Sequence, residues 1–150
     1  AVRYPRGSGS GVVPDSNMTA FPIGKARVLR QGQGEVAILA FGSMVHPAWQ
    51  AAEACDATLV DMRFVKPLDE KLLHSVFRKF KKIVTIEDGC IMGGMGSAVL
   101  EFMADNNYSA EVVRLGIPDK YIHHGTPAEL YAECGFDVSG IIENIKKLIQ

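Results

Sequence analysis

The strongest constraint on the fold is a nearly uninterrupted apolar run, EVAILAF, at residues 35–41. A strand with one face in water alternates apolar and polar side chains, whereas a strand covered on both faces is apolar throughout. Three further runs have the same character: ATLVDM at 57–62, KIVTIE at 82–87 and AEVVRLG at 110–116. These runs predict the buried strands of a sheet that is covered on both sides.

Helical patterns fill the intervals between these strands. Within residues 67–80, apolar side chains recur at positions 72, 73, 76, 77 and 80, which is the spacing of one helix face. The predicted helices are 43–55, 67–80, 94–105, 127–134 and 137–148. The first has Ser43 as N-cap and Pro47 in its first turn. The fourth follows a capping box formed by Thr126 and Glu129. Alternating strands and helices indicate βαβ units, so we expect a three-layer α/β/α domain. Its mostly parallel sheet should have about five strands, of which 25–32 is an edge strand in parallel or antiparallel orientation.

The N-terminal residues have the composition of a linker. Residues 7–20, GSGSGVVPDSNMTA, are rich in Gly and Ser, as is typical of a flexible connection. We therefore expect residues 21–150 to form the domain, and residues 1–20 to combine the end of a preceding domain with a linker. The chain opens AVRYPRG without an initiator Met, which favours the tail of a longer polypeptide or a processed product.

Composition and charge exclude several classes of protein. The 150 residues are 47% hydrophobic and 22% charged, with a formal net charge of -1, which is typical of a soluble globular domain and not of a nucleic-acid binder. No apolar run approaches the roughly 18 residues of a membrane helix. The cysteines, Cys55, Cys90 and Cys134, are odd in number and widely spaced. We therefore expect no disulfide framework, no zinc site and a reducing, cytoplasm-like compartment.

One cation stands where a ligand is expected to bind. Ligands of parallel sheets collect at the carboxyl ends of the strands, and VDMRFVKPLD (60–69) puts Arg63 at such an end. A guanidinium is a rigid fork of donors that matches phosphate or carboxylate oxygens. The structural alternative is an ion pair with Asp61, Asp69 or Glu87. The residues alone leave both interpretations open.

The other polar candidates have weaker signals. Glu87 and Asp88 are adjacent carboxylates at a strand end, where they serve either as a general acid/base or metal site or as helix-capping and loop acceptors. Adjacent strand residues point in different directions, which favours the second interpretation. His123 and His124 precede the capping box as loop residues. The sequence assigns none of these four residues a role.

The segment GGMGSAV at 93–99 approximates a dinucleotide-binding fingerprint. Val99 replaces the third small residue, and Arg114 stands where an acidic residue should end the next strand. We therefore expect the glycines to serve close packing of a helix start against a neighbouring element. Cys90 has no base beside it, and no complete catalytic set emerges from the residues.

A resemblance extends over nearly the whole chain. The segments that carry it are RYPRG (3–7), FPIGKARVLRQG (21–32), ILAFGSMVHPA (38–48), ATLVDMRFVKPLDE (57–70), VTIEDGCIMGGMGSAV (84–99), LGIPDKYIHHGTPAEL (115–130) and CGFDVSGI (134–141). In this order the chain resembles the C-terminal part of the deoxyxylulose-5-phosphate synthase family, within the transketolase superfamily. The combination of VDMRFVKPLD with IMGG-x-GS is specific to that family.

The resemblance implies a parent transferase that uses thiamine diphosphate and Mg²⁺. It condenses pyruvate and glyceraldehyde 3-phosphate to 1-deoxy-D-xylulose 5-phosphate with loss of CO₂, for isoprenoid and thiamine biosynthesis. It implies a homodimer, located in the cytoplasm or, in a plant or alga, in the plastid. Earlier domains of the parent hold the cofactor, so the present chain is expected to bind neither thiamine diphosphate nor Mg²⁺ and to be inactive alone.

The resemblance also implies a substrate site without catalytic or metal residues in this chain. Arg6 and Arg63 match the family arginines that hold the phosphate of glyceraldehyde 3-phosphate. Three alternatives stay open: the C-terminal domain of a transketolase, that of an oxo-acid dehydrogenase β subunit, and a free-standing binding or assembly domain without chemistry.

Overall fold

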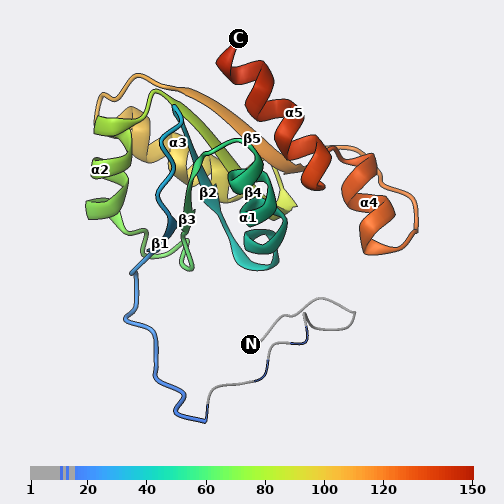
Figure 1. Ribbon diagram of the computed structural model, residues 1–150, viewed down its shortest axis with the longest axis horizontal. Coiled ribbons are helices and arrows are strands. Elements are labelled where there is room, and N and C mark those ends of the chain that lie inside the picture. The colour runs from blue at the N-terminus through green and yellow to red at the C-terminus, as the bar shows by residue number, and fades with distance from the viewer. Residues whose placement is uncertain (1–10, 12, 14–15) are drawn as a thin grey trace.

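Helices cover both faces of a five-stranded sheet in the computed structural model, which describes residues 11, 13 and 16–150 (Figure 1). Along the chain the elements are β1 (Arg27–Arg30), β2 (Val36–Ala40), the short 3-10 helix η1 (Gly42–Met44), α1 (Val45–Ala54), β3 (Thr58–Asp61), α2 (Glu70–Lys79), β4 (Lys82–Cys90), α3 (Met95–Asp105), β5 (Glu111–Ile117), α4 (Pro127–Glu133) and α5 (Val138–Ile149). The predicted alternation of strands and helices is confirmed.

The strands lie in the order β1-β3-β2-β4-β5. β1 runs antiparallel to β3, and the other neighbouring pairs are parallel. The three-layer α/β/α fold is thus confirmed, and the edge strand is antiparallel. The shared direction of β2, β3, β4 and β5 gathers their carboxyl ends at one edge of the sheet, where ligands of such folds bind.

The side chains of β2 explain why it lies at the centre. Ile38 and Ala40 enter a cluster under α1 and α5, whereas Ala37 and Leu39 enter a second cluster under α2 and α3. All four are fully buried. Because successive strand residues point to opposite faces, an apolar strand of this kind needs a helical layer on each side.

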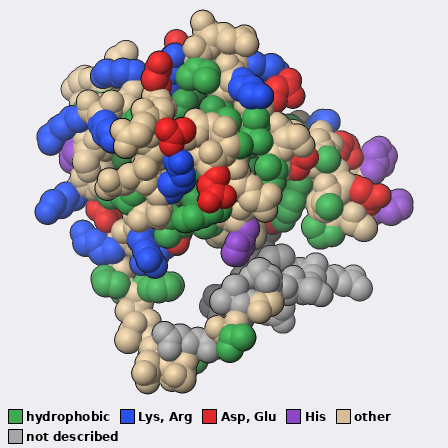
Figure 2. Space-filling model, in the orientation of Figure 1, with side chains coloured by type: hydrophobic (Ala, Val, Ile, Leu, Met, Phe, Trp, Pro, Cys, Tyr) green, Lys and Arg blue, Asp and Glu red, His purple; other side chains and the backbone are tan. Residues whose placement is uncertain are grey.

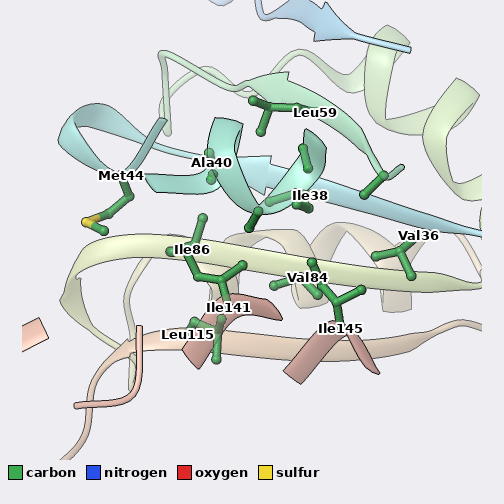
Figure 3. Packing of buried hydrophobic residues seen from close by; sticks show 14 of the residues in the cluster. Val36, Ile38, Ala40, Met44, Leu59, Val84, Ile86, Leu115, Ile141 and Ile145 are labelled. Carbon is green, nitrogen blue, oxygen red and sulfur yellow. The ribbon is translucent and has the colours of Figure 1, made fainter. Parts of the chain in front are cut away.

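Helix α5 closes the first cluster. Figure 3 shows Ile145 of α5 next to Val84 of β4. One turn earlier, Ile141 lies next to Leu115 of β5. Burying a side chain of this size contributes about 1.5–3 kcal/mol, so the two isoleucines fix the C-terminal helix on the sheet.

Aromatic rings fill the second cluster. Phe77 of α2 stacks on Tyr108 with ring centroids 5.2 Å apart, and its centroid lies 6.0 Å from that of Phe102 of α3. The Nδ1 atom of His74 lies 2.8 Å from the hydroxyl oxygen of Tyr108. The hydrogen bond satisfies the polar tip of the tyrosine while its ring stays in the apolar layer.

The start of α1 differs from the prediction. The helix expected at 43–55 begins as η1, and Met44 rather than Ser43 precedes α1, with no side chain capping either helix. Gly42 has a φ of +59°, which turns the chain sharply out of β2. The first turn after the strand is consequently a tight 3-10 turn.

Two other boundaries also move. The helix expected from residue 67 starts at Glu70, because Asp69 accepts a hydrogen bond from the amide of Leu72 and acts as N-cap. β4 continues to Cys90 rather than ending at Glu87, past a bulge in its pairing with β5. The spacing of apolar residues does not predict side-chain caps or bulges of this kind.

Residues 16–23 lie on the outside of the domain ahead of β1. Figure 1 shows them as an extended chain below the sheet, and all of them are exposed. On the face drawn in Figure 2, acidic and basic side chains lie beside one another instead of separating by sign. Among the described helices, none has the length and apolar character needed to cross a membrane.

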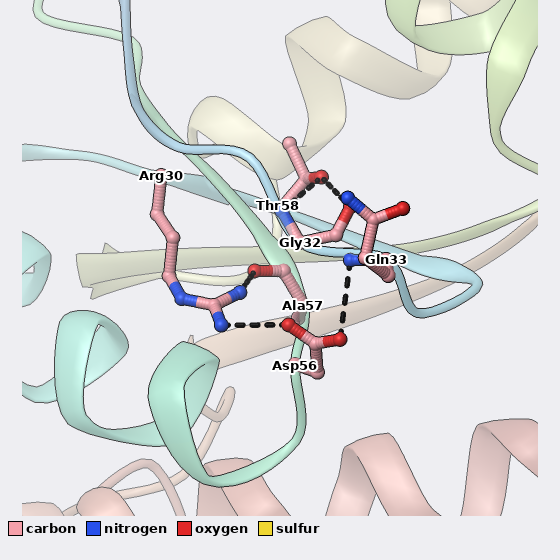
Figure 4. Close-up of polar contacts among 6 residues, drawn as sticks. All are labelled: Arg30, Gly32, Gln33, Asp56, Ala57 and Thr58. Atoms are coloured by element: carbon pink, nitrogen blue, oxygen red, sulfur yellow. Dashed lines mark hydrogen bonds and ion pairs between the residues drawn. The ribbon is translucent and has the colours of Figure 1, made fainter.

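A polar network ties the turn after β1 to the start of β3 (Figure 4). Arg30 donates to the carbonyl oxygen of Ala57 at 2.7 Å and pairs with the Oδ1 atom of Asp56 at 2.6 Å. The other carboxylate oxygen of Asp56 accepts a hydrogen bond from the amide of Gln33 at 3.3 Å. A side chain at Gly32 would collide with the backbone of Asp56, so the close approach needs glycine.

Asp56 should make folding sensitive to acid. The hydrogen bond from Arg30 lowers the pKa of Asp56 from its ordinary 3.8, outweighing burial, with help from the Gln33 amide and the Arg30 charge. Such a carboxylate stabilises the fold above its unfolded-state pKa and loses that contribution as the pH falls through its folded-state pKa. We expect Asp56→Asn to lower the free energy of unfolding at neutral pH. The deficit should shrink below about pH 4.

Urea unfolding of this chain at several pH values measures that deficit. The matched control is Asp119→Asn, which changes an exposed aspartate outside the network and should leave the free energy of unfolding unchanged. A deficit for Asp56→Asn that is independent of pH would contradict the assignment.

Candidate functional site

The segment that enters the domain meets the carboxyl edge of the sheet. β1 runs against the other strands, so its first residue, Arg27, pairs with Asp61, the last residue of β3. Arg63 follows β3 directly. The residues just before β1 therefore lie at the same edge, and Phe21 among them contacts Arg63.

The backbone of Arg63 is left-handed, with a φ of +58°. This conformation costs an L-residue other than glycine roughly 1–2 kcal/mol, and Asn and Asp tolerate it best. Asp56 and Asn107 are the other non-glycine residues with positive φ in the described part of the chain. Of these three residues, Arg63 is the one whose side chain is not typical of a left-handed backbone. Such strain persists where the surroundings fix it, and it gathers at ligand sites.

Asp61 holds Arg63 at two points. Its Oδ1 atom accepts a hydrogen bond from the backbone amide of Arg63 at 3.2 Å, and its Oδ2 atom accepts one from Nε at 3.3 Å. Sheet pairing with Ala40 on one side and Arg27 on the other fixes Asp61 itself. The predicted ion pair with Asp61 is therefore confirmed.

The guanidinium has an aromatic ring over one face and bonds to Asp61 through Nε. Its Cζ atom lies 4.1 Å from the centre of the Phe21 ring, and the Arg63 side chain is 17% exposed. Neither terminal nitrogen makes a hydrogen bond or ion pair with any described residue. The Nη1–Nη2 edge is one that binds phosphate or carboxylate oxygens by two parallel hydrogen bonds.

The other two proposed ion-pair partners of Arg63 are wrong. Asp69 is buried at the start of α2, where Oδ1 accepts from the amide of Leu72 and Oδ2 from the amide of Ala26, each at 3.1 Å. Glu87 is turned toward α3. The carboxylate of Asp69 therefore ties the entering segment to a helix N-terminus instead of neutralising Arg63.

Glu87 caps α3 from the neighbouring strand. Its Oε2 atom accepts a hydrogen bond from the amide of Met95 at 2.8 Å, and its Oε1 atom accepts one from the amide of Gly96 at 2.9 Å. Glu87 is buried, and a negative charge is favourable at the positive end of a helix. The predicted helix-capping role is confirmed.

The glycines of the 93–99 segment allow this contact. A Cβ atom on Gly94 would lie 2.5 Å from the Oε2 atom of Glu87, and one on Gly96 would lie 2.6 Å from the Oγ1 atom of Thr85. Close packing of the helix start is thus confirmed. The amides that a nucleotide phosphate would need are already bonded to Glu87, so the segment is no dinucleotide site.

Asp88 belongs to a different contact. Its Oδ2 atom accepts a hydrogen bond from the hydroxyl of Tyr131 in α4 at 2.8 Å. Burial raises the pKa of Tyr131, and the hydrogen bond to Asp88 and the charge of Asp88 raise it further, against a smaller opposing hydrogen bond from Ser43. Glu87 and Asp88 face different helices and do not form a shared acid/base pair.

The two histidines singled out in the sequence make no hydrogen bond or ion pair with any residue that the structure describes. His123 and His124 are exposed before α4, whose capping box of Thr126 and Glu129 is confirmed. No group of His, Cys, Asp and Glu side chains within residues 11, 13 and 16–150 is placed to hold a metal ion. Arg6 lies outside the described residues.

Two contacts were missed from the sequence. The sequence indicates Asp61 as a counter-ion, but an Asp two residues before a turn residue is also placed to accept the amide hydrogen of that residue. The sequence indicates Phe21 only as the start of the domain. Its contact with Arg63 had no local signal, because the antiparallel pairing of β1 with β3 creates it.

Known proteins match nearly the whole chain. A 1-deoxy-D-xylulose-5-phosphate synthase of Cytophaga hutchinsonii is 51% identical over 99% of this chain, and one of Aeromonas hydrophila is 51% identical over 100% of it. The chain spans 24% of the length of each of these relatives. The resemblance to that family is confirmed.

A solved structure supports the fold. A split gene transketolase, described as an inactive beta4 tetramer, superimposes with a TM-score of 0.78 at 32% identity, over 91% of this chain and 46% of that one. The family model of the transketolase C-terminal domain matches residues 24–141, from just before β1 into α5. With this sheet and this match, the chain belongs to the transketolase C-terminal domain family.

Proposed function

We propose that this chain is the C-terminal domain of a 1-deoxy-D-xylulose-5-phosphate synthase. Such an enzyme joins pyruvate and glyceraldehyde 3-phosphate with loss of CO₂, for isoprenoid and thiamine biosynthesis. The proposal is supported by relatives of that name that are 51% identical over nearly the whole chain. In this proposal the chain supplies acceptor binding and an assembly surface, and it is inactive alone.

Arg63 binds the phosphate of glyceraldehyde 3-phosphate in this proposal. The observation that carries the role is the Nη1–Nη2 edge, which bonds to no described residue and is held in place by Asp61 and by a strained backbone. A phosphate dianion accepts two parallel hydrogen bonds from that edge. Anchoring the non-reacting end of the acceptor restricts the approach of its aldehyde and so favours the bond-forming geometry. Arg6 supplies a second guanidinium to the same phosphate.

The cofactor belongs to another part of the parent. Thiamine diphosphate and Mg²⁺ need acceptors for the metal and donors for the diphosphate. Among the described residues, no carboxylate cluster could hold the ion, and the amides at the start of α3 already bond to Glu87. The described residues do not fit the cofactor, so we assign its binding to the preceding domains.

Domain division and assembly complete the proposal. Residues 1–20 form the end of a preceding pyrimidine-binding domain and a linker, and residues 21–150 form the present domain. The exposure of residues 16–23 supports a boundary there. The parent is a homodimer in the cytoplasm, or in the plastid of a plant or alga, and binds neither nucleic acid nor membranes.

A transketolase parent is the second candidate, favoured by the similarity to a split gene transketolase at 32% identity. Both enzymes use phosphorylated acceptors. An oxo-acid dehydrogenase passes its acyl group to a carrier without a terminal phosphate, so a phosphate-binding role of Arg63 counts against that alternative.

Product analysis of the full-length parent distinguishes the candidates. We expect CO₂ release from pyruvate and formation of a deoxyketose phosphate in the presence of glyceraldehyde 3-phosphate. Two-carbon transfer from a ketose phosphate without CO₂ would identify a transketolase. Neither activity would favour the free-standing binding domain.

Replacing Arg63 by Gly should separate its structural and binding roles. Glycine adopts positive φ without strain, so Arg63→Gly should keep stability within about 1 kcal/mol despite losing an ion pair. The KM for glyceraldehyde 3-phosphate in the full-length enzyme should rise on the order of tenfold or more. The KM for pyruvate should be unchanged.

Asn107→Gly is the matched control, because Asn107 also has a positive φ, of +55°. It should change stability by a similar amount and leave both KM values as they are. An Arg63→Gly enzyme with normal acceptor kinetics would remove Arg63 from the substrate site.

Glu87 should affect stability and not chemistry. Glutamine has a single side-chain acceptor oxygen, so Glu87→Gln leaves one of two amides at the start of α3 unpaired. We expect a loss of about 1–3 kcal/mol in urea unfolding of this chain. The kcat per folded full-length enzyme should be unchanged.

Glu101→Gln, on the exposed side of α3, is the control for loss of charge and should preserve stability. A fall in kcat of about 10²–10⁴ with unchanged stability would instead identify Glu87 as a general acid or base.

A further inference from the structure

We propose that Asp61 and Phe21 are positioning residues, which direct the guanidinium of Arg63 and thereby set the preference of the enzyme for a phosphorylated acceptor. The inference rests on the proposed function of Arg63 and deepens it. It assigns the two residues a role through Arg63, without contact with the substrate.

The argument for Asp61 begins with rigidity. Asp61 is the last residue of β3 and pairs with strands on both sides. Its two carboxylate oxygens hold the backbone amide and the Nε atom of Arg63. One rigid residue thus fixes both the strained backbone of Arg63 and the direction of its side chain. Because Asp61 binds at Nε, the Nη1–Nη2 edge points away from the carboxylate.

The charge of Asp61 acts against this benefit. A carboxylate 3.3 Å from the Nε atom of Arg63 reduces the positive potential that attracts a phosphate. If Asp61 were only a counter-ion, removing it would strengthen phosphate binding. If Asp61 directs the guanidinium, removing it weakens phosphate binding. The two roles predict opposite signs for the same measurement.

Phe21 covers the guanidinium from the entering segment. Phe21 as a whole residue is 61% exposed, and the Arg63 side chain beneath its ring is 17% exposed. An aromatic ring over a guanidinium attracts it through the ring quadrupole. It also keeps water from one flat face, which strengthens hydrogen bonds along the remaining edge.

The readout is acceptor specificity in the full-length enzyme. It is the ratio of kcat/KM for glyceraldehyde 3-phosphate to kcat/KM for unphosphorylated glyceraldehyde, an acceptor that cannot use Arg63. A defect confined to the phosphate lowers this ratio. General damage to the fold lowers both values and leaves the ratio unchanged.

We expect Asp61→Ala to lower the ratio on the order of tenfold, through a higher KM for glyceraldehyde 3-phosphate and an unchanged KM for pyruvate. Asp61→Asn should give an intermediate value, because its amide oxygen preserves one of the two hydrogen bonds. It also tests the proposal if Asp61→Ala does not fold. In an Arg63→Ala background, Asp61→Ala should add no further loss, because its effect passes through Arg63.

Phe21→Ala should lower the ratio by a smaller factor, about threefold, and Phe21→Tyr should restore it. The control is Ile23→Ala, which removes another exposed apolar side chain from the same segment and should leave the ratio unchanged.

Four results would overturn the inference, the last of them by removing the proposed function on which it rests. A lower KM for glyceraldehyde 3-phosphate in Asp61→Ala identifies a plain counter-ion. An unchanged ratio with both acceptors impaired identifies a purely structural role. A normal specificity ratio in Asp61→Ala, together with a low ratio in Arg63→Ala, rejects only the positioning role. A normal specificity ratio in Arg63→Ala rejects the proposed phosphate site itself.

Discussion

Burial of β2 on both faces is the constraint on which the rest of the structure depends. All five of its residues are at most 2% exposed, and it is paired with a parallel strand on each side. The register of that pairing sets Ala40 opposite Asp61. A slip by one residue would turn the side chains of β3 to the wrong face. The requirement that buries the centre of the sheet therefore also determines where the carboxylate that holds Arg63 is placed.

The apolar pattern was sufficient to predict the order of strands and helices, because a strand buried on both faces and an amphipathic helix differ clearly in the spacing of their side chains. It was insufficient at the turns. Gly42 and Asp69 determine where helices begin through a backbone angle and a side-chain hydrogen bond. Both depend on local geometry that the spacing of apolar residues does not encode.

The candidate site was predicted only in part, because its contacts also depend on local geometry. The position of Arg63 followed from its place after a strand. Its ion pair with Asp61 is confirmed, whereas its binding of an anion stays a proposal. Asp61 engages Nε, whereas the terminal nitrogens make no hydrogen bond with a described residue. The direction in which Glu87 points was not predictable, because it depends on how α3 approaches β4. Arg6 lies outside the described residues and stays a prediction.

The ring over Arg63 comes from the stretch by which the chain enters the domain, whereas the carboxylate beside it comes from the sheet. The guanidinium thus lies between the rigid sheet and the segment that leads into β1. The hydrogen bond from Ala26 to Asp69 fastens that stretch only a few residues after Phe21. A change in the path of the chain before Ala26 therefore moves the Phe21 ring relative to the guanidinium and leaves the ion pair with Asp61 intact. The proposed anion site is in this way mechanically linked to the direction from which the polypeptide enters the domain.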